Sequence, residues 1–168
     1  MSRFDDLNAA YKKCVADFET YQAKSKGYAD FLINGFAAYL GIQRTEINHL
    51  SINNDVPHSS PTSAMELEDD TYWHWRIRLT LAVPPMPFPK IYYRLRLKAD
   101  GDAILVGVGD EDKKHRINPL VKTDMEQFYE YLYQMGIDGL SNGLQRFLTE
   151  SGGEKIGFDV TRRKMGEL

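Results

Sequence analysis

"WHWRIRLTL", which runs from Trp73 to Leu81, alternates between apolar and polar residues almost without error. Its odd-numbered positions are all tryptophan, isoleucine or leucine, and its even-numbered positions are histidine, arginine or threonine. "YYRLRLK", from Tyr92 to Lys98, repeats the alternation with tyrosine and leucine at the odd positions. Successive side chains of a strand point to opposite faces of its sheet. Both stretches are therefore predicted to be strands with one apolar and one polar face.

These two strands belong to a predicted meander. Four prolines in "PPMPFP", residues 84–89, cannot donate hydrogen bonds to a ladder, so the first strand, 71–83, ends there. The second strand is expected over 90–98. Asp100-Gly101 is a strong signal for a two-residue hairpin turn, which leads into a third strand over 103–109.

Helical periodicity flanks the meander on both sides. Near the N-terminus, apolar residues recur at steps of three and four, which predicts one stripe of a helix: Phe4, Leu7, Tyr11, Cys14, Phe18 and Tyr21. That helix is expected to end near Gly27, and a second helix is expected over about 28–40 and closed by Gly41. A further helical pattern begins at Thr123, with an interruption at Gly136, and a short strand is expected over 156–160.

Runs of helix and strand that do not interleave predict an α+β fold. We expect an antiparallel meander of three to five strands, one face of which is packed by the N-terminal and C-terminal helices. The N-terminal stripe is expected to pack on the sheet, with Cys14 as a buried apolar residue. Its spacing is also that of a short coiled-coil seam.

The length of 168 residues predicts a single domain, 1–168. Within it, segment 54–70 combines prolines, serines and an acidic end, and is predicted to be a flexible loop. Segment 109–119 is predicted to be a charged loop, and residues 161–168 a frayed tail.

Composition excludes several classes of protein. One cysteine cannot form a disulfide framework within the chain, so a reducing, cytoplasmic location is expected. The polar, acidic N-terminus does not have the pattern of a signal peptide, and no apolar run has the length of a membrane span. The net charge of −3 means that any binding to nucleic acid requires a local basic patch.

Such a patch is predicted on the polar face of the meander. Between residues 71 and 99 there are six basic residues and no acidic one. The candidate ligand-binding or partner-binding residues are Tyr72, His74, Arg76, Arg78, Tyr92, Arg94, Arg96 and Lys98. Registers that keep the core face intact place arginine opposite arginine or lysine, which is destabilising. We therefore expect compensating contacts.

Three interpretations of this face remain open. Acidic segments such as 66–70 and 110–112 can fold over it. Alternatively, it binds an acidic protein partner or a second copy of the chain, because arginine and aromatic residues are enriched at interfaces. In the third interpretation it binds nucleotide or nucleic acid through phosphate contacts and base stacking.

No motif indicates an enzyme or identifies a family. The four histidines and the cysteine have no metal-ligand spacing, and no nucleophile or phosphate-loop motif is present, so no catalytic residue, metal or cofactor is predicted. An enzyme with a histidine or carboxylate site near the 54–70 loop remains an alternative, and its candidate histidines are His58, His74 and His115. The sequence favours a small cytosolic binding protein that uses the basic face.

Overall fold

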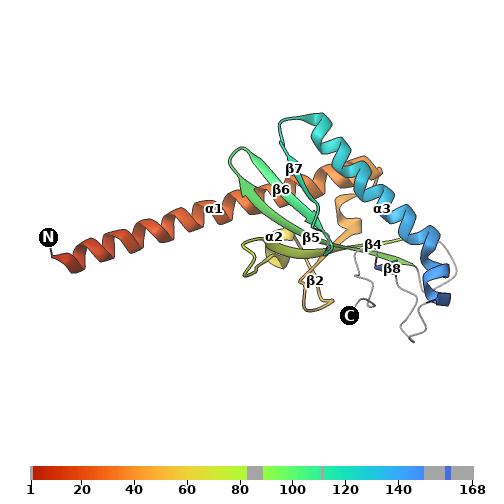
Figure 1. The fold of residues 1–168 in the computed structure, drawn as a ribbon, viewed down its shortest axis with the longest axis horizontal. Helices are drawn as coiled ribbons and strands as arrows, with labels where there is room; N and C mark the ends of the chain where they lie inside the picture. The colour runs from red at the N-terminus through yellow and green to blue at the C-terminus, as the bar shows by residue number, and fades with distance from the viewer. Residues whose placement is uncertain (1, 83–88, 111, 150–157, 160–168) are drawn as a thin grey trace.

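The structure is a computed structural model, and it describes residues 2–82, 89–110, 112–149 and 158–159. The α+β fold is confirmed: a largely antiparallel sheet carries a long N-terminal helix and a C-terminal helix (Figure 1). The central sheet order is β2-β1-β4-β5-β6-β7, so the strands exceed the predicted three to five. They span β1 Ile47–Leu50, β2 Pro57–His58, β4 Trp73–Thr80, β5 Lys90–Asp100, β6 Ala103–Val108 and β7 Lys114–Ile117. Two short strands lie off this path: β3, Glu66–Leu67, pairs with β4, and β8, Phe158–Asp159, pairs in parallel with β5.

The N-terminal helix α1 runs without a break from Arg3 to Leu40, so the predicted break at Gly27 is wrong. Ser2 caps its start, and Asp5 completes a capping box by accepting a hydrogen bond from the Ser2 backbone. Gly41 ends it in the left-handed conformation with φ of 70°, as predicted. One glycine costs a helix about 1 kcal/mol, and the packing of the following residues on the sheet outweighs that cost.

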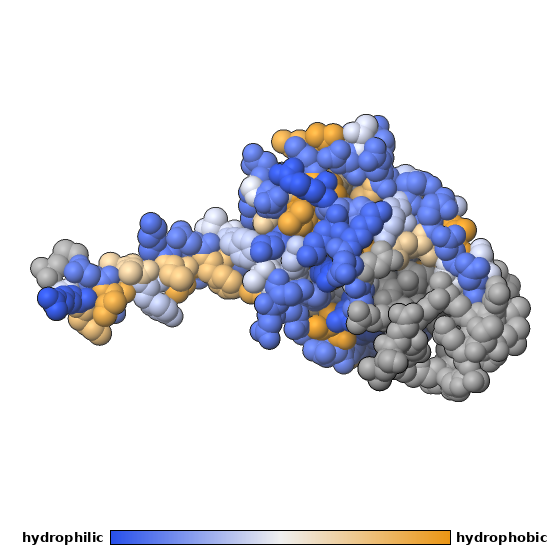
Figure 2. Space-filling model, viewed as in Figure 1, coloured by the Kyte–Doolittle hydropathy of each residue, from blue (hydrophilic) through white to orange (hydrophobic). Residues whose placement is uncertain are grey.

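The first half of α1 does not pack on the sheet. Residues 2–20 are all exposed and extend away from the body of the protein as an arm (Figure 1). The prediction that the stripe of Phe4, Leu7 and Tyr11 is buried against the sheet is therefore wrong, and Cys14 is exposed as well. Apolar residues follow the arm along its length in Figure 2.

The second half of α1 and helix α3, Lys122–Thr149, cover the apolar face of the sheet. The core joins both helices to the odd-numbered residues of β4 and β5. Phe36 of α1 meets Tyr93 of β5 edge to face, with ring centroids 6.0 Å apart. The predicted interruption of α3 at Gly136 is wrong: the helix is continuous, and the glycine accommodates the Tyr93 hydroxyl, which lies 2.4 Å from where a Cβ would stand.

Two segments that were predicted to be loops contain regular secondary structure. Segment 54–70 contains β2, the short helix α2 (Pro61–Ala64) and β3, and segment 109–119 contains β7, which the sequence analysis missed. A 3-10 turn, η1 (Arg44–Glu46), precedes β1. The prolines of 84–88 and the predicted tail 161–168 lie outside the described residues. In the part of the chain that the structure describes, no helix is long and apolar enough to span a membrane.

Two glycines of α1 should respond differently to substitution by alanine, because only one of them lies in close contact with α3. A Cβ on Gly35 would stand 1.9 Å from the hydroxyl of Tyr129, which is buried, whereas a Cβ on Gly27 meets nothing within 4 Å. We expect Gly35→Ala to lower the free energy of unfolding by about 1–3 kcal/mol through overpacking. Gly27→Ala should raise it by about 0.5–1 kcal/mol. Urea denaturation of both variants measures these changes, and equal changes of one sign would contradict the packing described.

Candidate binding face of the sheet

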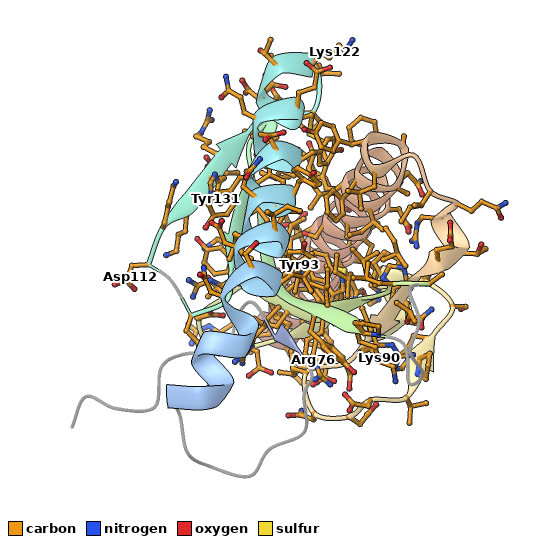
Figure 3. All side chains as sticks on the ribbon, turned by 90° about the vertical axis from the view of Figure 1, so that its right-hand side faces the viewer. Arg76, Lys90, Tyr93, Asp112, Lys122 and Tyr131 are labelled. Atoms are coloured by element: carbon orange, nitrogen blue, oxygen red, sulfur yellow. The ribbon has the colours of Figure 1, made fainter. Side chains whose placement is uncertain are left out.

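The polar side chains of the meander share the face of the sheet that lies opposite the helices. The even-numbered residues of β4 and β5 project from it, as Arg76 and Lys90 do in Figure 3. Strand β7 adds two basic residues that the sequence analysis did not include. We name this surface the basic face: Tyr72, His74, Arg76, Arg78, Lys90, Tyr92, Arg94, Arg96, Lys98, Lys114 and Arg116. Alternation in "KHRI", residues 114–117, is the short signal that would have revealed β7.

The register between β4 and β5 places one pair of like charges directly opposite each other. Arg76 pairs with Arg94, while Arg78 lies opposite Tyr92 and His74 lies opposite Arg96. The expectation of several opposed basic pairs is therefore wrong. Because Arg78 lies opposite a tyrosine, it has no like charge directly across the ladder. Its guanidinium donates to the Asn48 side chain at 2.7 Å.

The register between β5 and β6 also differs from the prediction, by two residues. Asp100 pairs with Ala103, so the turn residues are Gly101 and Asp102 rather than Asp100 and Gly101. Gly101 has φ of 59°, which suits the first central position of a type II′ turn. As a result Arg96 lies beside Gly107, whereas a turn at Asp100 and Gly101 would have placed Arg94 there. A Cβ on Gly107 would stand 2.4 Å from the Arg96 Nε, so the glycine lets this side chain lie flat over β6.

The loop before β2 compensates the charge of Arg76. The Arg76 guanidinium donates to the backbone oxygens of Ser51 and Asn54 and to the carboxylate of Asp55, at 3.0, 2.7 and 2.8 Å. The Arg76 side chain is 20% exposed and that of Asp55 is 68% exposed. This ion pair therefore lies at the rim of the basic face and is open to water.

Other acidic residues approach the basic face from its edges. Arg94 pairs with Asp110 at 3.3 Å, and Arg116 pairs with Asp100 at 3.0 Å. These contacts are part of the first interpretation, in which the chain compensates its own basic residues. Three of the acidic residues on the face, Asp55, Asp70 and Asp110, lie in connections between strands.

His74 is held by one of these connections. Its Nε2 lies 2.9 Å from both carboxylate oxygens of Asp70, whose Oδ1 also accepts the backbone N–H of Tyr72 at 3.0 Å. Partial burial opposes ionisation of Asp70, but the hydrogen bonds from Tyr72 and His74 and the charges of His74 and Arg96 outweigh it and lower the pKa of this carboxyl. The carboxylate therefore orients the imidazole.

Two cations lie close to one aromatic ring of the basic face. The ammonium groups of Lys98 and Lys114 are 5.8 and 5.1 Å from the centre of the Tyr72 ring, which is buried. Lys98 also donates to the Thr71 hydroxyl at 2.8 Å. Burial of the ring means that Tyr72 supports the two lysines and does not offer an open stacking surface.

The other histidines named for the enzyme alternative, His58 and His115, lie in different surroundings. His115 packs against the rings of Phe128 and Tyr131, with centroids 5.2 and 4.4 Å apart. His58 pairs with His49 across β1 and β2 on the other side of the sheet. Among the described residues, no group of three or more histidine, cysteine, aspartate or glutamate side chains is arranged to hold a metal ion.

His49 is a buried residue whose polar partners near α1 are partly exposed. Arg44 donates to its Nε2 and to the side chain of Asn34, and also pairs with Asp30 at 3.7 Å. Burial, reinforced by the positive charge of Arg44 and by His58, lowers the pKa of His49 to about 3. The imidazole is therefore neutral and accepts the guanidinium hydrogen bond.

A groove of about 350 Å³ lies between α1 and the start of α3, away from the basic face. Its lining is mainly apolar and includes Phe31, Tyr39, Leu120, Met125 and Tyr129. At its rim Tyr39 donates to Glu130, which raises the pKa of the tyrosine and lowers that of the carboxyl. None of the residues predicted for the basic face lines this groove.

Comparison with known proteins adds no relative to this description. No family model, no curated protein and no solved structure matches the chain. The functional argument therefore depends on the geometry of the described residues.

The low pKa of His49 predicts a particular loss of stability in acid. Its folded pKa of about 3 lies below the ordinary value of 6.5, so the unfolded chain binds a proton that the folded chain does not. This contribution to stability is complete above that ordinary value and is lost as the pH falls towards the folded pKa, by up to about 1.4 kcal/mol per pH unit. In His49→Gln, whose amide oxygen can accept the Arg44 hydrogen bond, the free energy of unfolding should fall less steeply over this pH range. Urea denaturation at several pH values measures both slopes, and identical slopes would contradict the assignment.

Proposed function

We propose that the chain is a cytosolic, non-enzymatic binding protein whose basic face engages an acidic protein partner. The observation that carries the proposal is the distribution of charge over four adjacent strands. On β4 to β7 the side chains opposite the helices are basic, aromatic, small or neutral, and Asp100, at the last position of β5, is the one acidic residue among them. The single cysteine supports a reducing compartment.

Two of the carboxylates that pair with the basic face in the described part of the chain are themselves exposed. Asp110 and Asp55 are 40% and 68% exposed, and both come from connections rather than from the sheet. Exposed ion pairs of this kind contribute only about 0–1 kcal/mol. Carboxylates of a partner can therefore replace them at small cost, and further basic side chains stand beside them in the same rows of the sheet.

A protein partner fits this surface better than nucleic acid does. The net charge of −3 repels a polyanion at long range, whereas an acidic patch on a protein acts over a shorter distance. Single-stranded nucleic acid also requires aromatic rings with an open face for stacking. Tyr72 is buried close to two lysines, so its ring does not serve that purpose. Tyr92, the other tyrosine of the basic face, is half-buried and lies opposite Arg78.

Charge reversal on the basic face tests the proposal. Arg94→Glu combined with Lys98→Glu should weaken binding to a fluorescein-labelled poly-glutamate peptide of about 20 residues by at least about tenfold, because the reversed charges repel the peptide. Lys26→Glu combined with Lys122→Glu changes the net charge equally but lies off this face, and should weaken binding less than about twofold. Fluorescence anisotropy measures both affinities, and circular dichroism verifies that the variants fold.

Two results would contradict the proposal. Equal weakening by both pairs of substitutions would show that net charge, not the basic face, attracts the peptide. Tighter binding to a single-stranded oligonucleotide of equal charge, with a steep loss in salt, would instead favour a phosphate-bearing ligand.

A further inference from the structure

The arm of α1 is a helix with an apolar stripe that nothing in the described part of the chain covers. It extends over residues 3–20, about 27 Å at 1.5 Å per residue. Five large apolar side chains on it are exposed: Phe4 by 69%, Leu7 by 69%, Tyr11 by 71%, Val15 by 37% and Phe18 by 46%. A helix surrounded by water on all sides is normally polar all round. The apolar stripe therefore indicates that another surface covers this part of the helix.

The same stripe continues into the body of the protein, where it is buried. In heptad notation, the a positions are Phe4, Tyr11, Phe18, Ser25 and Leu32, and the d positions are Leu7, Cys14, Tyr21, Tyr28 and Gly35. Ser25 and Leu32 are fully buried beneath the sheet, and Tyr21 and Tyr28 pack against the core. The sheet therefore covers the seam from Tyr21 onward and leaves its first half uncovered.

We propose that the arms of two copies of this chain pair antiparallel through the exposed half of the seam. Leu7 of each copy packs against Tyr11 of the other, and Phe4 packs against Cys14. The two-fold axis passes between the helices near Ala9. The pairing joins the two bodies at opposite ends of a short two-helix coil.

The position of the body selects this register. In the next longer antiparallel register, Phe4 of the second copy would have to pack on Tyr21, whose exposed surface is already reduced by the sheet. Lys24, one turn further, donates to the backbone oxygen of Gly101 in the turn after β5. The proposed register stops the second helix close to Phe18, so it is the longest overlap that avoids the body.

The charges along the arm favour the same register. In a coiled coil the charged residues that flank the seam are those at e and g positions. The proposed register brings Arg3 of one copy, at a g position, near Asp17 of the other, at a g position as well, and the two-fold symmetry makes this contact twice. Asp5, Asp6, Lys12 and Lys13 are at b and c positions, on the side of the arm away from the seam.

Other arrangements lack this pair of opposite charges. In a parallel, in-register pair, each g residue lies near the e residue five positions further along the second copy, which sets Arg3 near Asn8 and Asp17 near Gln22. The longer antiparallel register sets Arg3 near Lys24, so like charges meet. Opposite-charge complementarity therefore distinguishes the proposed pair from both alternatives.

The stability expected for this pair is modest. Aromatic residues bury about 150–250 Å² each when covered completely, so the partly covered stripes of two arms give an interface on the order of 1,000 Å². That area is at the low end of specific protein interfaces. We therefore expect association at micromolar concentrations, with monomer and dimer both present.

Sedimentation velocity of the full chain tests the association. At about 200 µM, well above a micromolar dissociation constant, the wild-type protein should sediment with twice the monomer mass of 19.3 kDa, and it should dissociate on dilution. Leu7→Asp places a charge in the seam and should give a monomer at the same concentration. Ala9→Asp adds the same charge on the opposite side of the arm and should remain a dimer.

Cysteine crosslinking tests the direction of the helices. In the proposed pair, Cys14 of the two copies are ten residues apart along the axis, about 15 Å, beyond the reach of a bismaleimide of about 8 Å. Phe4→Cys brings the new thiol beside Cys14 of the second copy and should yield a covalent dimer with that reagent. Phe4→Cys combined with Cys14→Ser leaves only distant thiols and should yield none.

Three results would overturn the proposal. A wild-type chain that stays monomeric at about 200 µM would show that the stripe does not pair with itself. A Leu7→Asp variant as dimeric as the wild type would place the interface elsewhere. Crosslinking of wild-type Cys14 to itself, with a dimer that Leu7→Asp abolishes, would mean a parallel pair and would reject the antiparallel register.

Discussion

The pairing of β4 with β5 is the constraint on which the rest of the structure depends. Because side chains alternate at a period of two, burying Trp75 of β4 and Tyr93 of β5 on one face forces every arginine of these strands onto the other. A slip of one residue would bury the arginines and expose the core. The hydrophobic effect thus fixes the register, and the concentration of positive charge on the opposite face follows from it.

That concentration of charge explains the shape of the surrounding segments. Arg76 and Arg94 lie directly opposite each other, which is unfavourable without compensation. The connection between β1 and β2 supplies backbone oxygens and Asp55 to one of them, and the connection between β6 and β7 supplies Asp110 to the other. The side chains in the rows of the basic face on β4 and β5 are mainly cationic, which supports the proposed binding of an acidic protein.

Helix α1 uses one apolar seam in two environments. From Tyr21 onward the sheet covers the seam, and before that point water does. Burial of Leu32 and Phe36 anchors the helix, so the arm begins from a turn that is already formed and needs no separate nucleation. A rigid extension with an apolar stripe can meet a second helix without an ordering cost in its backbone, which favours association through this segment.

Local periodicity was enough to predict the α+β class, the strands of the meander, Gly41 as the end of α1 and the side chains of β4 and β5 that share the polar face, because each depends on residues a few positions apart. What local pattern could not decide were quantities set by distant partners. Whether Gly27 or Gly136 ends a helix depends on what packs beside it. Whether the stripe at Phe4 is buried depends on how far the sheet extends. Which arginine lies opposite which depends on the register of β4 against β5. Which arginine lies beside Gly107 depends on a turn that moves by one residue and so shifts the register by two, without altering either face. The tertiary structure decided these points, because a buried contact outweighs a single-residue preference of about 1 kcal/mol.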